Sequence, residues 1–345
     1  MEKKLLVLYV GGTIGMRASA KGWVPEPGYL EAEMNNIPAF HKPIMPKYRI
    51  RELPQVLDSS NMSPVHWMEI AKIIQQEYQK YHGFIILHGT DTMAYTAAAL
   101  SFYLEGLSKP VILTGSQIPI SEPRNDAVEN VVSAMLFATN FKVREVCIYF
   151  HSVLLRGNRA RKIDSNALRA FDSPNLPPLG TGGVYQEIHS DLLLDRPKST
   201  KLVVQAHRRV EVGVIWFLPG LTGTAFETML SHPFEAVVFM AFGTGNGPSQ
   251  NEHFLRAVQQ AVDRGVVIVD CSQCYKGMVS IFDYETGNAL EDAGVISGYD
   301  LTPEAAIAKL THLLGIGLEP KTVQKLMKKS LVGEMTLPNK NRKYL

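Results

Sequence analysis

Cysteine and long apolar segments are both scarce in this chain of 345 residues. Its three cysteines, Cys147, Cys271 and Cys274, are too few for a disulfide framework and suit a reducing compartment. No stretch approaches the roughly 20 apolar residues that a membrane-spanning helix needs. The N-terminal apolar run, 5–10, is shorter than the core of an export signal, and no small-residue cleavage site follows it. We therefore expect a cytoplasmic protein without a membrane partner.

A charge excess of either sign is also lacking, because 35 lysines and arginines face 33 acids, which gives a formal net charge of +2. Such a balance creates no strong electrostatic field, so we expect no nucleic-acid partner. The segment "CSQC", 271–274, has the spacing of a metal-ligand pair, but no second Cys or His pair at finger spacing accompanies it. The sequence therefore predicts no metal site.

Short β-rich runs alternate with helical patterns along the chain. In the first half the predicted strands cover 5–10, 84–89, 111–115 and 145–150. Between the first two, Ser63 and Pro64 begin a helix that is predicted over 63–82 from apolar residues at helical spacing. Strands that are apolar on both faces and separated by helices indicate a parallel sheet covered on both sides.

The alternation is interrupted once and then resumes. From Asp172 to about Val212 the pattern dissolves into a stretch that we interpret as loop, hairpin and linker. Strand patterns return at 212–220, 234–245 and 265–274, and a last helix is predicted from Thr302, its N-cap, to Gly315. The sequence thus predicts an α/β fold with parallel sheets covered by helices in two domains. The predicted boundaries are an N-terminal domain over 1–184, a linker over 185–212 and a C-terminal domain over 213–345.

The segment "YVGGTIGM", 9–16, places two glycines directly before Thr13 at the end of a predicted strand. Open parallel sheets form their sites beyond the carboxyl ends of strands. A phosphate loop needs G-x-x-x-x-G-K-[ST] and a dinucleotide fold needs G-x-G-x-x-G, and the segment matches neither. The alternative is covalent catalysis by Thr13, with glycines that let a carbonyl group approach and that free N–H groups for an oxyanion.

Three further polar clusters lie near predicted strand ends or helix starts, namely "DSSNM" (58–62), "HGTDT" (88–92) and "RGNRARK" (156–162). Thr90 offers a second hydroxyl and Asp91 a carboxylate, although Asp91 also suits a helix N-cap. Lys162 is a candidate base, because lysine accepts a proton only in its neutral form, which burial or neighbouring arginines favour. The alternative for the 156–162 segment is a solvated basic loop. Each of these motifs, taken by itself, is compatible with a catalytic and with a purely structural role.

The motifs "GGTIG", "DSS", "HGTDTMAYTA", "LTGSQIP" and "RGNRARK" occur in this order and are followed by "GTGN" and "YETGNALEDAGVISGYDLT". In this combination the chain resembles the L-asparaginases of the bacterial type, and most of all their cytoplasmic type I branch. The resemblance covers nearly the whole chain. It implies a two-domain α/β hydrolase, assembled as a homodimer or homotetramer, that converts L-asparagine to L-aspartate and ammonia without a metal or other cofactor.

The resemblance also implies roles for individual residues. Thr13 attacks the side-chain amide and carries a β-aspartyl ester, which water then hydrolyses. Thr90, Asp91 and Lys162 form a second triad, in which Lys162 draws a proton away through Thr90. The residues implied in binding the α-amino and α-carboxylate groups of the substrate are Asp58, Ser59, Ser60, Thr90 and Asp91.

The segment after Gly15 matches the mobile lid of this family but departs from it at one position. Many relatives carry a tyrosine there that touches the nucleophile, whereas this chain has Trp23, whose indole has a donor and no acceptor oxygen. Either Trp23 only shields the site or another phenol replaces the tyrosine. Tyr284 is the first candidate, with ordinary packing as its alternative, and Tyr29 is the second. Asn246 in "GTGN" is a candidate contribution across a subunit interface.

Two other departures concern regulation. Type I enzymes with an allosteric asparagine site carry an arginine where this chain has Met240, and a threonine where it has Arg161. Met240 cannot make a bidentate contact with a carboxylate. The sequence therefore predicts weak or absent activation by asparagine, unless Arg161 rebuilds the effector site.

Three other functions share parts of this pattern. A dual glutaminase–asparaginase stays open, because one methylene gives only about 10- to 200-fold discrimination in a simple pocket. The amidotransferase subunit that processes misacylated tRNA shares the motifs, but we expect it to carry an extra N-terminal domain and a basic face. The third alternative is not an enzyme but a non-catalytic amino-acid sensor. A sensor would not need Lys162, and Trp23 is the feature that favours it.

Overall fold

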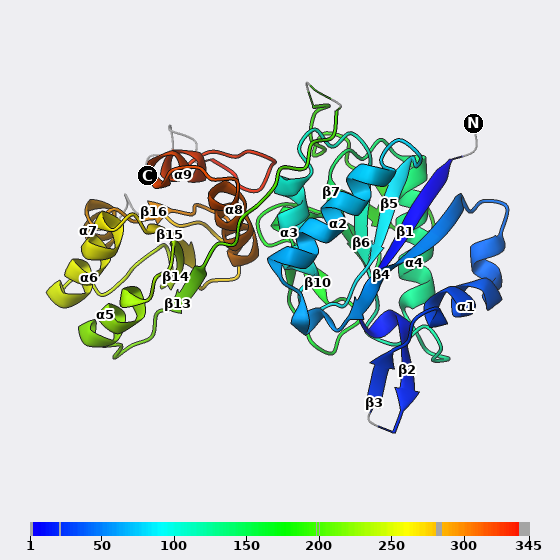
Figure 1. Cartoon of the computed structure of the whole chain (residues 1–345), viewed down its shortest axis with the longest axis horizontal. Coiled ribbons are helices and arrows are strands. Elements are labelled where there is room, and N and C mark those ends of the chain that lie inside the picture. The colour runs from blue at the N-terminus through cyan, green and yellow to red at the C-terminus, as the bar shows by residue number, and fades with distance from the viewer. Residues whose placement is uncertain (1–2, 21, 198, 200, 281–284, 338–345) are drawn as a thin grey trace. The chain divides into compact units, whose positions relative to one another are not determined.

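The structure, a computed structural model, describes residues 3–20, 22–197, 199, 201–280 and 285–337. The chain divides into two compact units, Met1–Val204 and Gln205–Leu345 (Figure 1). The predicted linker, 185–212, contains the end of the first unit, including strand β12 (Gln186–Ile188), and the start of the second. None of the described helices is long and apolar enough to cross a membrane.

The first unit is built on one eight-stranded sheet. Strand β1 (Lys4–Gly11) lies between β4 (Lys47–Leu57) and β5 (Gly83–Leu87) and pairs in parallel with both. The parallel ladder continues through β6 (Val111–Thr114) and β7 (Val146–Phe150). The opposite edge is antiparallel and consists of β8 (Val153–Arg156), β11 (Gly180–Gly182) and β12. The predicted parallel sheet is confirmed, with an antiparallel edge that the hydrophobic pattern does not indicate.

Helices cover both faces of this sheet (Figure 1). Helices α1 (Tyr29–Asn36) and α4 (Ala127–Asn140) contribute buried residues to a core that includes Val7 and Tyr9 of β1. Helices α2 (Pro64–Glu77) and α3 (Met93–Tyr103) lie on the other face, where Tyr78, directly after α2, stacks on Phe84 of β5. Helix α2 begins at Pro64 as predicted but ends at Glu77 rather than at residue 82.

Short elements at the strand ends complete the first unit. Strands β2 (Met16–Ser19) and β3 (Gly22–Pro25) form an antiparallel hairpin, and β9 (Arg161–Lys162) pairs with β10 (Phe171–Asp172). The 3-10 helices are η1 (Thr13–Gly15), η2 (Pro38–His41), η3 (Ser59–Asn61) and η4 (Gly157–Arg159). Helices η1 and η3 and the 88–92 segment follow β1, β4 and β5, which are adjacent in the sheet. Three of the polar clusters therefore meet at one sheet edge.

The second unit contains a four-stranded parallel sheet in the order β13 (Val212–Trp216), β14 (Ala236–Ala241), β15 (Val267–Ser272) and β16 (Ile296–Ser297). Its described helices are α5 (Gly223–Ser231), α6 (Glu252–Asp263), α7 (Glu285–Asp292), α8 (Pro303–Gly315) and α9 (Pro320–Met327). Phe217, Phe239 and Phe254 share the core beneath α5 and α6. The predicted N-cap Thr302 accepts the N–H group of Ala305 at 3.1 Å. The two-domain α/β prediction is confirmed.

Candidate active site

Three segments converge at the carboxyl ends of β1, β4 and β5. Gly11 and Gly12 have φ values of 129° and 91°, which favour glycine. A Cβ on Gly11 would lie 1.9 Å from the carbonyl oxygen of Leu57, and a Cβ on Gly12 would lie 2.2 Å from the Cα of Gly89. The two glycines therefore allow the turn that carries Thr13 to pack directly against the ends of the neighbouring strands.

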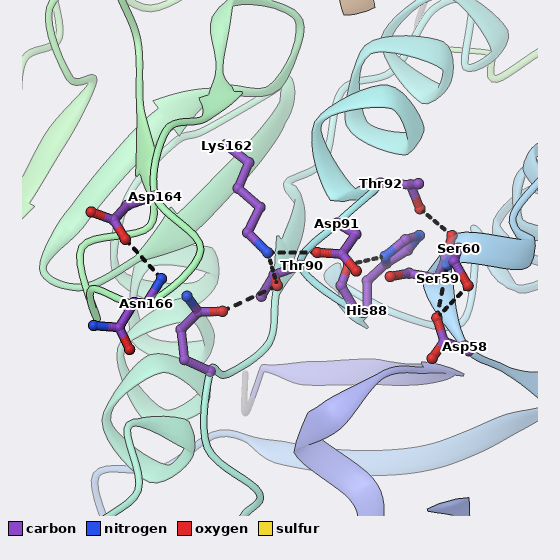
Figure 2. Close-up of polar contacts among 12 residues, drawn as sticks. Asp58, Ser59, Ser60, His88, Thr90, Asp91, Thr92, Lys162, Asp164 and Asn166 are labelled. Atoms are coloured by element: carbon purple, nitrogen blue, oxygen red, sulfur yellow. Dashed lines mark hydrogen bonds and ion pairs between the residues drawn. The ribbon is translucent and has the colours of Figure 1, made fainter. Parts of the chain in front are cut away.

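The candidate substrate-binding residues lie on the turn after β4. Asp58 Oδ1 accepts hydrogen bonds from the Ser60 N–H group at 2.9 Å and from the Ser60 hydroxyl at 2.8 Å (Figure 2). Ser59 is buried beside Gly89, since a Cβ on that glycine would lie 2.5 Å from Ser59 Oγ. The Thr92 hydroxyl donates to the carbonyl oxygen of Ser59 at 2.7 Å. These contacts attach the 58–60 turn to the 88–92 segment.

Lys162 extends from β9 to the same segment. Its Nζ donates to Thr90 Oγ1 at 2.8 Å and to Asp91 Oδ1 at 2.6 Å (Figure 2). The Lys162 side chain is only 19% exposed, whereas that of Asp91 is 65% exposed. The Asp91 carboxylate thus stabilises the ammonium group on one side and keeps an open side that can receive a positively charged ligand group. The structure brings Thr90, Asp91 and Lys162 together, and their catalytic roles stay a prediction.

Gln117 is a site residue that sequence analysis does not identify. The Thr90 hydroxyl donates to Gln117 Oε1 at 3.1 Å, while the same hydroxyl oxygen accepts a hydrogen bond from Lys162 Nζ. Gln117 Nε2 donates in turn to the carbonyl oxygen of Ala167 at 3.2 Å. The available signal was its place in "LTGSQIP" directly after β6, where polar residues reach the site edge of a parallel sheet.

His88 lies behind the site and holds its backbone. Burial lowers the pKa of His88 to about 4, although the hydrogen bond to Gly89 opposes that shift. The ring is therefore neutral, with Nδ1 donating to the Gly89 carbonyl oxygen at 2.7 Å and Nε2 accepting from the Thr96 hydroxyl at 2.8 Å. Because a trans peptide points its C=O and N–H groups in opposite directions, the N–H group of Thr90 points away from His88.

The predicted lid is the β2–β3 hairpin, which follows η1 directly. Trp23 pairs with Ala18 across the hairpin, and its side chain is 42% exposed. Arg17 and Glu26 form an ion pair at 3.1 Å near the base of the hairpin. The hairpin begins at Met16, directly after the 3-10 turn that contains Thr13.

Tyr284 and Asn246 are the two remaining predicted residues. Tyr284 lies outside the described residues. Asn246 belongs to the second unit, where its backbone N–H group donates to the Phe242 carbonyl oxygen at 2.8 Å. Among the described residues no group of three or more His, Cys, Asp or Glu side chains is placed to hold a metal ion. Cys271 is buried and Cys274 is exposed, and neither forms a disulfide bond with a described cysteine.

Comparison with known proteins matches both halves of the chain. The family described as "Asparaginase, N-terminal" matches residues 4–193, and "Glutaminase/Asparaginase C-terminal domain" matches residues 211–327. The "L-asparaginase 1" of Escherichia coli strain K12 is 43% identical over 97% of this chain and 98% of its own length. The crystal structure of L-asparaginase I from Vibrio cholerae O1 biovar eltor matches with a TM-score of 0.91 and 44% identity, over 98% of this chain and 100% of that one. The "60 kDa lysophospholipase" of Mus musculus is 40% identical over 98% of this chain, which spans 63% of that protein.

Proposed function

The chain belongs to the asparaginase family, and we propose that it hydrolyses the side-chain amide of L-asparagine to L-aspartate and ammonia. The observation that carries the proposal is the pair of contacts from Lys162 to Thr90 and Asp91. Binding of a small molecule would not require a lysine placed against a threonine hydroxyl. The Escherichia coli and Vibrio cholerae relatives, both named L-asparaginases, match this chain over nearly its full length.

In the proposed first step Thr13 is the nucleophile. Its Oγ forms a bond to the side-chain carbonyl carbon of asparagine, and the tetrahedral intermediate carries its negative charge on the former carbonyl oxygen. The carbon–nitrogen bond then breaks, and the leaving nitrogen takes up the proton that Thr13 loses, so that ammonia departs. Backbone N–H groups beside Gly12 and Gly89 are the candidate oxyanion donors, and one such donor is worth about 3–4 kcal/mol in a transition state.

Thr90 and Lys162 handle the proton in this proposal. In its protonated form Lys162 donates to both Thr90 and Asp91. In its neutral form Lys162 Nζ accepts the Thr90 hydroxyl proton, and Thr90 in turn accepts a proton from the attacking group. The same relay activates the water that hydrolyses the β-aspartyl ester in the second step, which releases aspartate and restores the Thr13 hydroxyl.

The charged ends of the substrate are proposed to bind on the other side of the site. The exposed face of the Asp91 carboxylate suits the α-amino group of asparagine. The Ser59 hydroxyl suits the α-carboxylate, beside the turn in which Asp58 holds Ser60. Hydroxyls, carboxylates and an ammonium group around Thr13 favour a small zwitterionic substrate over the lysophospholipid that the name of the mouse relative indicates.

Further parts of the proposal concern assembly and the lid. We propose a cytoplasmic homodimer or homotetramer, with Asn246 contributing across the subunit interface. Trp23 shields the closed site. We also propose that Met240 and Arg161 leave the enzyme without activation by asparagine.

The test is ammonia release by the purified protein from L-asparagine and L-glutamine, titrated from micromolar to millimolar concentrations, with Thr13→Ala beside it. We expect a hyperbolic rate curve, selectivity for asparagine and loss of turnover in Thr13→Ala. Comparable rates on both amides would favour a dual glutaminase–asparaginase, and a sigmoidal curve would contradict the interpretation of Met240 and Arg161. Asparagine binding without any turnover would identify a sensor and refute the proposed enzyme.

A further inference from the structure

A single loop contacts both threonine-bearing segments of the candidate site. This loop, residues 115–120 and here named the bridging loop, follows strand β6 directly. At one end Gln117 Oε1 accepts the Thr90 hydroxyl at 3.1 Å. At the other end the N–H group of Ile120 donates to the carbonyl oxygen of Ile14 at 3.0 Å, next to Thr13. A displacement of the bridging loop would therefore change the positions of Thr13 and Thr90 together.

One carboxylate, that of Asp126, holds the bridging loop. The Gln117 N–H group donates to both Asp126 oxygens, at 3.1 and 3.0 Å, and the Ile118 N–H group donates to Oδ1 at 3.0 Å. Asp126 is 8% exposed and lies at the start of helix α4. Within the described part of the chain no lysine or arginine forms an ion pair with Asp126, so N–H groups stabilise its buried charge. Hydrogen bonds to an ionised acceptor are roughly twice as strong as neutral ones.

Asn130, one turn further along α4, fixes the start of the same loop. Its Nδ2 donates to the Gly115 carbonyl oxygen at 3.0 Å and to Asp126 Oδ2 at 3.2 Å, and the side chain is fully buried. Gly115 in turn packs against the 88–92 segment, since a Cβ there would lie 2.3 Å from the carbonyl oxygen of His88. Helix α4 thus anchors the bridging loop at two points, and Asp126 is common to both.

From these contacts we infer that Asp126 is a positioning residue, which acts through Gln117 to fix the Thr90 hydroxyl between Gln117 and Lys162. The inference rests on the proposed function, because it assigns Thr90 a part in proton transfer. An asparagine at 126 has one acceptor oxygen and one NH₂ group, so it cannot accept N–H groups on both sides as the carboxylate does. At least one of the N–H groups that now donate to Asp126 would face the NH₂ group of the new asparagine, which is also a donor. The bridging loop would then shift.

The test is a double-mutant cycle in ammonia release from L-asparagine with Asp126→Asn, Gln117→Met and the double variant. A displacement of about 1 Å at a catalytic group can cost about 100-fold in rate, so we expect each single variant to lose about 10- to 100-fold in kcat. The value of KM should change less than kcat, because Thr90 is the one substrate-binding candidate with a described hydrogen bond to the bridging loop. Asp58, Ser59, Ser60 and Asp91 have none. If Asp126 acts through Gln117, the double variant is no slower than the slower single variant.

Thr139→Val is the matched control, because Thr139 is a buried residue at the far end of the same helix and donates to the Met135 carbonyl oxygen at 2.9 Å. This control should lower the unfolding midpoint without changing kcat. If the wild-type protein hydrolyses asparagine and Gln117→Met has the same kcat, the inference is overturned while the proposed function stands. This comparison holds even if Asp126→Asn fails to fold. Multiplicative losses in the double variant would also overturn it. A wild-type protein inactive on asparagine would overturn the proposed function and this inference together.

Discussion

Gly12 and Gly89 meet backbone to backbone at the centre of the candidate site, so closely that a Cβ on Gly12 would lie 2.2 Å from the Gly89 Cα and 2.3 Å from its nitrogen. This contact joins the turn of Thr13 to the segment of Thr90 and Asp91. The glycines that precede the proposed nucleophile are therefore required by packing between two strand ends as well as by access for a substrate.

Gly12→Ala should abolish catalysis while leaving most of the fold intact. The added methyl group meets backbone atoms that cannot give way, and the positive φ of 91° adds strain of about 1–3 kcal/mol. We expect a loss of at least about 100-fold in kcat, from displacement of Thr13 against Thr90. Gly220→Ala is the control, since Gly220 has a φ of 87° but no atom within 4 Å of an added Cβ. Equal activities of the two variants would show that crowding at Gly12 is unimportant.

Lys162→Met should remove proton transfer while retaining the shape of the side chain. Loss of a general base typically costs about 10²- to 10⁴-fold in rate, and we expect kcat to fall within that range. Lys162→Arg preserves the ion pair with Asp91 but supplies no group that can be deprotonated, so its kcat should fall similarly. Steady-state kinetics of both variants on asparagine provide the measurement. Retention of wild-type kcat by either variant would remove Lys162 from the mechanism.

Most of the parallel core and the order of the polar motifs could be predicted from the sequence. Strands β1, β5, β6 and β7 are continuous apolar runs, which short-range patterns identify well. The sequence analysis does not predict strand β4. Its sequence, "KYRIRELPQVL", mixes charged residues with a proline and resembles neither a buried run nor a clean alternation. The antiparallel edge of the sheet is also not predicted, because β8, β11 and β12 are short and their pairing depends on tertiary contacts.

The residues of the candidate site could be predicted where they belong to a motif that is typical of a known family. They were harder to predict where a residue's role depends on contacts that only the folded chain makes. Thr90, Asp91 and Lys162 lie together although Lys162 is 71 residues from Asp91 in the sequence. Gln117 and Asp126 gave no comparable signal. An aspartate before a helix suggests an N-cap, yet Asp126 binds the N–H groups of the preceding loop instead.

Acid should destabilise the first unit through His88. Its pKa of about 4 lies below the ordinary value of 6.5, so the unfolded chain binds a proton that the folded chain does not. The stability that the neutral ring contributes is present above pH 6.5 and falls by up to about 1.4 kcal/mol per pH unit between pH 6.5 and 4. Urea unfolding across this range should show a flatter pH dependence for His88→Asn, which can still donate to the Gly89 carbonyl. Identical slopes for the two proteins would contradict this assignment.

Asp270 in β15 should make the second unit less stable as the pH rises, whereas His88 makes the first unit less stable as the pH falls. Burial raises its pKa to about 8, and neither carboxyl oxygen has a hydrogen-bond partner among the described residues. The folded chain then holds a proton that the unfolded chain releases above its ordinary pKa of 3.8, so stability falls as the pH rises from about 4 to 8. Asp270→Asn should be more stable than the wild type at pH 8, with a difference that shrinks towards pH 4. A variant that is less stable at pH 8 would contradict a neutral Asp270.

The central claim is that Thr13 forms a covalent bond to the substrate. Its most direct test is acid quenching of the enzyme during turnover of L-asparagine, followed by proteolysis and mass spectrometry. The mechanism predicts an aspartyl ester on the peptide that contains Thr13, and its absence from Thr13→Ala. An ester located on Thr90 instead, or turnover that persists in Thr13→Ala, would contradict the assignment of Thr13 as the nucleophile.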